Sequence, residues 1–266
     1  MKPSDIARIK ELLPTRLGSE EIREKIAADI LRRSIFSARM TSAGYLAKLR
    51  EVVAQMLEGK ISQATARDTL EGILEQMGHS MQDGFGLENP ASIRRLNLIL
   101  ETQTQMAASV AKSHEQTESV VNEFPAWALM RIESRRAPRE DWLARWNAAG
   151  SSCGWEGARR DPWYGSGASF AFVALKSSPI WVALGHGVGG FTDTLGNPYP
   201  PFAYSSGMGW EPVNREIAET LGLVKPGETL AALEAKSLSP TSAEIAEVAR
   251  RHGFDFNDFA RELQNG

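Results

Sequence analysis

Tryptophan is confined to one part of this 266-residue chain, and its distribution constrains the fold more than any other feature of the sequence. The seven tryptophans all lie between residues 127 and 210: Trp127, Trp142, Trp146, Trp155, Trp163, Trp181 and Trp210. Residues 3–77 contain none, and their apolar residues recur at helical spacing instead. The sequence therefore predicts an α+β protein, mainly α, with an N-terminal helical hairpin or bundle and a small Trp-rich module that contains a short β-sheet.

The N-terminal region, residues 1–78, has the apolar stripes and capping residues of consecutive amphipathic helices. Ser19 followed by two acids is typical of a helix start, Thr41-Ser42 is expected to break the pattern, and Ser62 is expected to cap a helix that Gly78 ends. The stripes are Ile22, Ile26, Ile30, Leu31, Ile35 and Phe36, then Leu46, Leu49, Val52, Val53, Met56 and Leu57, then Ala66, Leu70, Ile73, Leu74 and Met77. Short connections between them imply antiparallel packing.

The central region, residues 79–225, is expected to contain a long central helix and the Trp-rich module. Residues 79–90 are polar and without period, which predicts a linker or exposed loop. A helix from about 91 to 118 would span on the order of 40 Å. It is expected to bury Ile93, Leu96, Ile99, Leu100, Met106, Ala107 and Val110. Strands are predicted at 127–132 and 170–175, helices at 139–149 and 211–221, and loops at 150–169 and 185–209.

Dense tryptophan in a glycine-rich region has two interpretations. Exposed rings stack on bases or sugars, whereas buried rings supply the core of a small irregular domain. We favour the core, and expect Trp127, Trp142, Trp146 and Trp181 to be buried. The helix at 139–149 is expected to place Trp142, Leu143 and Trp146 on one face.

The C-terminal region, residues 226–266, follows a boundary at Lys225-Pro226-Gly227 and is expected to be a helical tail. Thr241 and Glu244 have the spacing of a capping box, and Gly253 is expected to end the helix that they begin. Four apolar residues then predict one more short amphipathic helix: Phe254, Phe256, Phe259 and Leu263.

Composition narrows the class of protein. The net charge of −3 argues against a dedicated nucleic-acid binder. A single cysteine, Cys153, excludes an internal disulfide and a Cys-rich zinc module. No apolar run approaches the roughly 18 residues of a membrane span. We therefore expect an intracellular protein with no membrane partner.

The charge is uneven, because residues 131–160 hold seven arginines against four acids. Five of them are candidates for contacting phosphates or a partner protein: Arg131, Arg135, Arg136, Arg139 and Arg145. One alternative is a nucleic-acid-binding module that uses the Arg131–Arg160 segment. We favour pairing within the chain, since Glu133, Glu140 and Asp141 interleave with the arginines.

No motif in the sequence carries convincing catalytic chemistry. Residues 185–190 match G-x-G-x-x-G, but the glycine and three prolines of residues 191–201 prevent the helix that a dinucleotide site requires. Ser205-Ser206-Gly207 and Gly165-Ser166-Gly167 are the elbows that a hydrolase or transferase would use, and neither gives G-x-S-x-G. Cys153 has no histidine partner that the sequence can place. The four histidines (His79, His114, His186 and His252) lack metal-ligand spacing, so we expect no catalytic residue, metal or cofactor.

Several segments share a pattern with a known family, in order, over roughly residues 30–225. The first are Ile35-Phe36-Ser37-Ala38-Arg39-Met40, Ala64-Thr65-Ala66-Arg67 and Arg94-Arg95-Leu96-Asn97-Leu98-Ile99-Leu100-Glu101-Thr102. The next are Pro125-Ala126-Trp127-Ala128-Leu129, Glu133-Ser134-Arg135, residues 139–146, Ala174-Leu175-Lys176 and Ser178-Pro179-Ile180-Trp181. The most distinctive stretch is Pro198-Tyr199-Pro200-Pro201-Phe202, followed by Ser205-Ser206-Gly207-Met208. Together they resemble the minor head proteins of tailed bacteriophages, in the head morphogenesis family related to the phage Mu F protein.

The resemblance implies a structural protein and not an enzyme. Members of this family associate with the portal and the inner face of the procapsid. The partners implied here are the portal, the major capsid or scaffold protein, and packaged DNA, with no small-molecule substrate. The implied location is the host cytoplasm during assembly and then the interior of the procapsid or virion. Many relatives end this core with a His-Pro-x-Cys-Arg-Cys-like motif, whereas residues 199–206 of this chain contain no cysteine, so no metal is expected.

Overall fold

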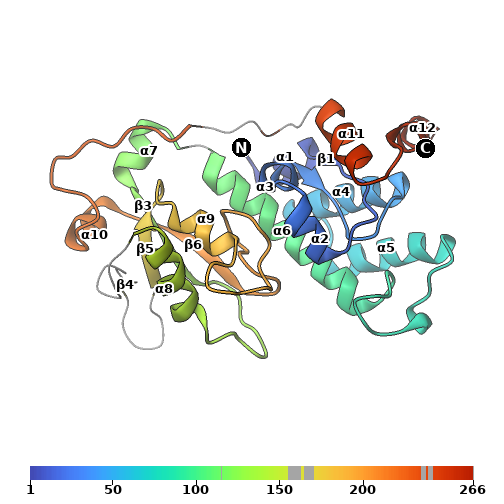
Figure 1. The fold of residues 1–266 in the computed structure, drawn as a ribbon, viewed down its shortest axis with the longest axis horizontal. Helices are drawn as coiled ribbons and strands as arrows, with labels where there is room; N and C mark the ends of the chain where they lie inside the picture. The colour runs from blue at the N-terminus through green and yellow to red at the C-terminus, as the bar shows by residue number, and fades with distance from the viewer. Residues whose placement is uncertain (115, 155–162, 165–170, 235–237, 239–241, 266) are drawn as a thin grey trace. The chain divides into compact units, whose positions relative to one another are not determined.

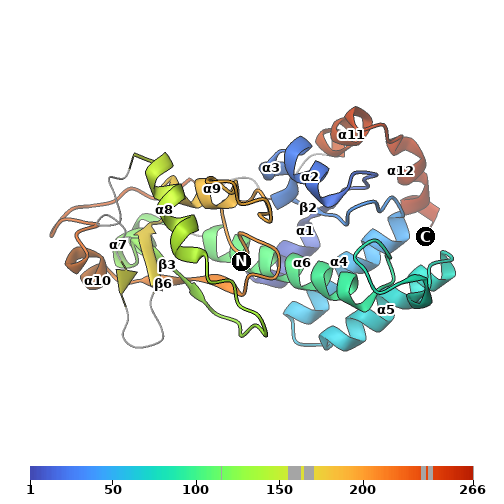
Figure 2. The ribbon, with the colours of Figure 1, turned by 60° about the horizontal axis from the view of Figure 1, so that its bottom comes forward.

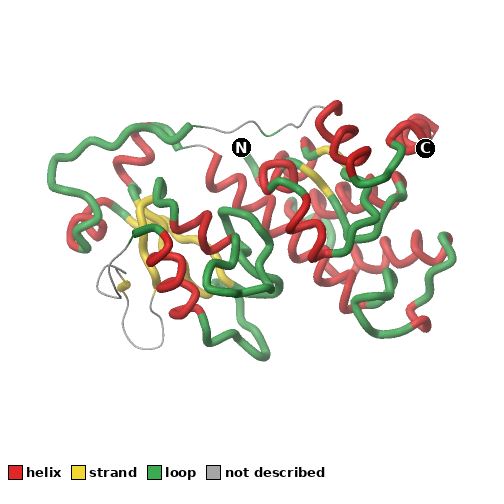
Figure 3. Tube along the Cα trace, viewed as in Figure 1, coloured by secondary structure: helices red, strands yellow, loops and turns green. Residues whose placement is uncertain are grey.

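The computed structural model describes residues 1–114, 116–154, 163–164, 171–234, 238 and 242–265 (Figure 1). The chain forms two compact units, Met1–Ala111 with Ser237–Gly266 (unit 1) and Lys112–Lys236 (unit 2). Helices make up most of the regular structure and the strands are few (Figure 3). The predicted class, α+β and mainly α, is confirmed. The units group the chain differently from the expected regions 1–78, 79–225 and 226–266, because both ends of the chain belong to unit 1.

Unit 1 begins with short elements: α1 (Pro3–Ile9), β1 (Glu11–Leu12), α2 (Ser19–Lys25), α3 (Ala28–Arg32) and β2 (Ser34–Ile35). β1 and β2 pair in parallel, with Leu12 opposite Ile35. The prediction that the first stripe is entirely helical was therefore wrong. The backbone becomes extended at Ile26 and again after Arg33. An apolar run as short as residues 34–36 cannot distinguish the period of about 3.6 residues of a helix from the period of about 2 residues of a strand.

The predicted helical hairpin consists of α4 (Ala43–Leu57) and α5 (Gln63–Gln76). Ser42 and Ser62 cap them as expected, since their hydroxyls accept hydrogen bonds from the backbone N–H groups of Tyr45 and Thr65. α4 packs against α1, α5 and α12 (Phe256–Asn265). Leu49 of α4 is fully buried, so α4 lies at the centre of unit 1.

The long helix is α6 (Ile93–His114), preceded by the 3-10 turn η1 (Met81–Asp83). Five of its predicted apolar residues are buried: Leu96, Leu100, Met106, Ala107 and Val110. Ile93 is 46% exposed, contrary to the prediction, while the polar Arg95 and Gln103 are buried. Both reach backbone carbonyls, because Arg95 donates to Leu87 and Ala38, and Gln103 donates to Phe36. The spacing of apolar residues cannot predict which polar residues are buried, because burial of a polar residue depends on its hydrogen-bond partners.

The predicted C-terminal helices are present as α11 (Ser242–Arg251) and α12. Thr241 of the expected capping box lies outside the described residues. Ile245 of α11 belongs to the same apolar cluster as Leu13 and Ile22. Glu244 accepts hydrogen bonds of 3.1 and 3.2 Å from the guanidinium of Arg33. The C-terminal helices are therefore part of the N-terminal core and not an independent tail.

Unit 2 is built on an antiparallel sheet of order β4-β5-β3-β6, with strands β3 (Ala126–Arg131), β4 (Trp163–Tyr164), β5 (Ala171–Leu175) and β6 (Met208–Val213). The strands predicted at 127–132 and 170–175 are confirmed for their described residues, while Phe170 lies outside them. β6 contradicts the expected loop and helix at 208–213. Its Gly209 and Pro212 disfavour a strand, but Pro212 is tolerated because β6 is at an edge of the sheet.

Both faces of the sheet are covered. Successive residues of β3 point to opposite faces, so that Ala126 and Ala128 lie on one face and Trp127 and Leu129 lie on the other. One face carries aromatic rings under α8 (Trp142–Ser152) and α9 (Ile180–Gly185), which lie side by side (Figures 1 and 2). The other face is a cluster of Ala126, Ala128, Val173 and Val213 that packs against Ile217 of α10 (Arg215–Thr220). The remaining helix of unit 2, α7 (Glu118–Glu123), leads into β3.

Candidate functional site

The aromatic residues of unit 2 form a connected core. The ring of Trp146 lies 5.4 Å from Phe172 and 5.6 Å from Trp181, and Trp210 lies 5.2 Å from both Trp181 and Trp127. The four tryptophans predicted to be core are at most 5% exposed: Trp127, Trp142, Trp146 and Trp181. That prediction is confirmed, and these rings do not offer a stacking surface. Leu143 departs from its predicted place, because it is 55% exposed on the other side of α8.

Four of the five candidate arginines make contacts within the chain. Arg131 donates to the carbonyls of Ser206 and Arg139, each at 3.0 Å. Arg135 pairs with Glu133 at 2.7 Å, as the interleaved charges suggested. Arg136 is exposed and has no ion pair among the described residues. The remaining two, Arg139 and Arg145, converge on Asp193.

The ion-pair network of α8 joins that helix to the segment 186–207. Asp193 pairs with Arg139 at 2.7 Å and with Arg145 at 2.8 Å, and Arg145 also pairs with Asp141 at 2.9 Å. Arg145 is 6% exposed, and its guanidinium lies 4.4 Å from the ring of Phe191. Burial would raise the pKa of Asp193, but hydrogen bonding and charge from Arg145, together with Arg139, lower it. The pKa of Arg145 is raised because its two carboxylates outweigh its burial.

Asp193 was not among the predicted site residues, although the sequence carries a signal for it. It is the only carboxylate between residues 162 and 210, in a segment rich in glycine and proline. A lone acid in such a segment is a candidate counter-ion for the arginines of residues 131–160. The network it forms is fully charge-paired, so its chemistry is structural: it fixes an irregular segment to α8.

The glycine-rich motif at 185–190 also serves packing. Gly185 ends α9, so the motif follows a helix instead of a strand. A Cβ atom at Gly185 would lie 1.9 Å from the carbonyl oxygen of Asn197, which shows how closely the two backbones approach. Gly187 has a φ of +66°, in the left-handed region that favours glycine. The geometry is that of a tight loop and not of a phosphate cradle.

Two of the candidate nucleophiles, Ser206 and Cys153, have structural contacts, whereas Ser205 is exposed and has a φ of +49°. Ser206 is 1% exposed, and its hydroxyl oxygen accepts a hydrogen bond from the backbone N–H of Met208 at 3.2 Å. The Sγ atom of Cys153 lies 3.9 Å from the hydroxyl of Ser152. Among the described residues, no hydrogen bond joins it to a histidine. Gly165-Ser166-Gly167 lies outside the described residues. In the part of the chain that is described, no three His, Cys, Asp or Glu side chains lie together in a way that could hold a metal ion.

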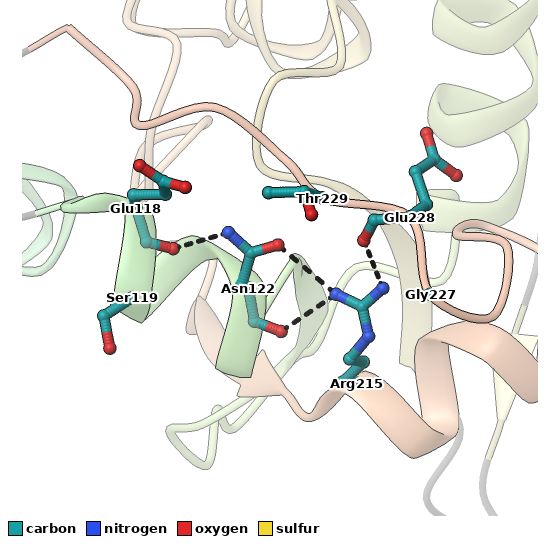
Figure 4. Close-up of a pocket in the computed structure, with 7 residues that line it drawn as sticks. All are labelled: Glu118, Ser119, Asn122, Arg215, Gly227, Glu228 and Thr229. Carbon is teal, nitrogen blue, oxygen red and sulfur yellow. Dashed lines mark hydrogen bonds between the residues drawn. The ribbon is translucent and has the colours of Figure 1, made fainter.

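A pocket of about 580 Å³ opens beside α7 and α10 in unit 2 (Figure 4). Its one cation is Arg215, whose Nε donates to Glu219 at 2.8 Å. One terminal nitrogen donates to the carbonyl and side-chain oxygens of Asn122, and the other donates to the carbonyls of Lys225 and Glu228. A guanidinium has five N–H donors, so all of them are used within the chain. The donors of Arg215 are therefore directed at groups of the chain itself.

Asn122 completes this arrangement from α7. Its amide nitrogen donates to the carbonyl of Glu118 at 2.8 Å (Figure 4). The same nitrogen donates to the carbonyl of Leu230 at 2.8 Å, and the amide oxygen accepts from the N–H of Leu230 at 2.8 Å. Arg215 and Asn122 therefore fasten residues 225–230 to α7 and α10. Neither was predicted from the sequence, because their partners are backbone groups and leave no pattern of side-chain types.

No helix among the described residues is both long and apolar enough to cross a membrane. Comparison with family models, with curated proteins and with solved structures finds no match for this chain.

Proposed function

We propose that this protein is a minor head protein of a tailed bacteriophage, which acts in head morphogenesis by docking to the portal or to the inner surface of the procapsid. The observation that carries the proposal is the ordered resemblance over residues 30–225, above all at residues 198–208. In the structure this stretch is packed into unit 2, with Tyr199, Phe202 and Ser206 at most 2% exposed. Its residues serve architecture, as the distinctive part of a structural protein would.

A structural role is also supported by how the chain uses its polar groups. Ser206, Arg145, Asp193 and Arg215 are the side chains that a search for chemistry selects, and each has its partners inside unit 2. An enzyme instead keeps a nucleophile or a charged group available to its substrate. The hydrolase or transferase alternative would rest on Ser205, which is exposed and has a φ of +49°, but no hydrogen bond joins this serine to a general base among the described residues.

Protein partners are favoured over packaged DNA. Among the described arginines of the 131–145 segment, Arg136 is the one that is exposed without an ion pair, which is too little charge to hold a phosphate backbone. The proposed partners are therefore the portal, and after it the major capsid or scaffold protein. The proposed location is the host cytoplasm during assembly and then the procapsid or virion interior.

Co-expression with the portal protein encoded by a neighbouring gene tests the proposal. We expect affinity capture of this chain to retain the portal, with a complex mass that corresponds to a defined ratio of the two. A portal from an unrelated phage is the matched control and should not be retained. Failure to retain the portal, the major capsid protein and the scaffold protein in turn would contradict the proposal. Tight binding to duplex DNA that weakens steeply with salt would favour the nucleic-acid alternative instead.

A further inference from the structure

The connection between α5 and α6 together with the first residue of α6, residues 77–93 (Figure 1), carries four exposed large apolar side chains. Phe85 is 89% exposed, more than any other large apolar side chain in the described residues. Met77, Leu87 and Ile93, all in the same segment, are 40%, 40% and 46% exposed. Single exposed apolar residues are ordinary, but four exposed large apolar side chains within 17 residues make this segment a candidate contact surface.

Phe85 is exposed on a loop that is held in place. Asn89 is 8% exposed, and its amide nitrogen donates to the carbonyls of Ser80 and Gly84, both at 2.8 Å. The hydroxyl of Ser92 donates to the carbonyl of Gly86 at 2.7 Å. These bonds fix the backbone on both sides of Phe85, so its ring is presented by a defined turn.

Arg95 supports the same loop from α6. Its side chain is buried, and burial lowers its pKa. It donates to the carbonyl of Leu87 at 3.0 Å and to the carbonyl of Ala38. Rearranging the loop would break these hydrogen bonds and leave donors of a buried arginine unpaired, which costs free energy. A preorganised loop loses little conformational entropy when it binds, which is what an anchor residue requires.

The charge around Phe85 indicates the chemistry of the partner. Residues 71–93 contain four carboxylates, Glu71, Glu75, Asp83 and Glu88, against one exposed cation that follows them, Arg94, so the border is acidic in sum. An acidic border repels nucleic acid and the anionic headgroups of a membrane surface. It attracts a protein surface that carries lysine or arginine. The exposed ring in turn requires an apolar pocket, since aromatic anchors bind by filling one.

We infer that residues 77–93 form a docking surface whose anchor is Phe85, for a partner protein with an apolar pocket bordered by lysine or arginine. The inference rests on the proposed function, which makes the portal protein the probe to use. It adds the place of contact, at the turn before α6 and the first residue of that helix.

The test compares Phe85→Ser with wild type in the full chain, titrated against the purified portal. Because Phe85 is 89% exposed, the variant should keep the wild-type melting temperature. We expect the dissociation constant to rise at least about tenfold, as for a hot-spot aromatic residue. Leu143→Ser is the matched control, since Leu143 is 55% exposed in unit 2, and it should bind the portal like wild type.

A second variant tests the acidic border separately. Glu75→Gln with Glu88→Gln removes two exposed carboxylates and leaves Phe85 in place. We expect weaker binding than wild type at low salt, with the difference shrinking as salt screens the charges.

The outcomes separate this inference from the proposed function. If wild type binds the portal and Phe85→Ser binds within about twofold of it, the docking surface is wrong while the proposed function stands. If wild type does not bind the portal, the inference is overturned together with portal docking. If wild type binds vesicles of phosphatidylcholine and phosphatidylglycerol and Phe85→Ser does not, Phe85 is a membrane anchor and the inference is wrong.

Discussion

At the scale of single residues, Lys10 is the group whose environment is least favourable to its charge. It follows α1, it is 1% exposed, and its amine has no hydrogen-bond partner among the described residues. Burial lowers its pKa from 10.5 to about 7, and the charge of Arg32 contributes to the same effect. Nothing in the sequence Ile9-Lys10-Glu11 distinguishes this lysine from an exposed one, so its burial was beyond prediction from sequence.

The buried amine predicts a pH dependence of stability. Between pH 7 and 10.5 the unfolded chain binds a proton at Lys10 that the folded chain does not. The free energy of unfolding should therefore rise with pH by up to about 1.4 kcal/mol per unit across this window. Below pH 7 both states are protonated, and the cost of burial is present in full. Urea unfolding of wild type from pH 7 to pH 10 measures the slope.

Lys10→Met is the variant that isolates this effect, because it keeps the length of the side chain and removes its charge. We expect it to be more stable than wild type at pH 7 and to lose the contribution of Lys10 to the slope. Lys48→Met, at an exposed surface pair with Glu51, is the control and should leave the slope unchanged. An identical slope in Lys10→Met and wild type would show that the amine is not buried in solution.

Trp146 represents the residues that the sequence did predict. Its burial followed from the residue type, because a large apolar ring in a small module has few places other than the core. It is fully buried in contact with Phe172 and Trp181. Trp146→Ala should lower the free energy of unfolding of unit 2 by about 3–5 kcal/mol, measured by urea unfolding. A variant of unchanged stability that no longer bound the portal would instead favour the ring as a binding platform.

At the scale of elements, the sequence predicted the long helices, because a single apolar period extends over many residues. It did not predict elements that depend on backbone contacts or lie at the edge of a sheet. α4, α5 and α6 have the length to show a 3.6-residue period, and most of their interior residues were predicted correctly; the exceptions are Ile93 at the start of α6 and Met77 just after α5, which are exposed because each lies at a helix end. β6 was not predicted because it contains Gly209 and Pro212, residue types that are rare in strands except at the edge of a sheet. Leu143 was misplaced because Trp142 and Trp146, four residues apart, set the buried face of α8, and the next residue turns away from it.

The contact between α8 and segment 186–207 gives a prediction at this scale. Asp193→Asn removes the charge that Arg139 and Arg145 share. We expect a loss of about 1–3 kcal/mol in the stability of unit 2, because Arg145 is buried while Asp193 is partly exposed. Glu133→Gln breaks a more exposed pair with Arg135 and should cost less than about 1 kcal/mol. Equal effects of the two substitutions, measured by urea unfolding, would contradict a structural role for the network.

At the scale of the whole molecule, the division of the chain could not be read from one sequence. The expected boundaries followed local composition, at glycine near 78 and at the proline turn near 225. The units depend instead on contacts between distant residues, such as Arg33 with Glu244 and α4 with α12. Deleting residues 1–78 would therefore remove α4 and expose the faces of α11 and α12 that pack in unit 1. Point substitutions are the better way to test what unit 1 does.

The distribution of tryptophan makes the two units separately observable. All seven tryptophans lie in Lys112–Lys236, so tryptophan emission reports unit 2, while unit 1 contributes much of the helical circular dichroism. Leu49→Asp places an unpaired charge at a fully buried position of α4, at a cost of several kcal/mol, comparable with the stability of a domain. We expect this variant to lose helical signal and to keep the native tryptophan emission.

Leu143→Asp, at an exposed position of α8, is the control and should leave both signals unchanged. One apolar cluster, around Leu13 and Ile245, lies in unit 1, and another, around Ala128 and Val213, lies in unit 2. Loss of the first cluster should therefore leave unit 2 folded. A red shift of tryptophan emission in Leu49→Asp, with the same urea midpoint as its circular dichroism, would mean that the two units unfold as one.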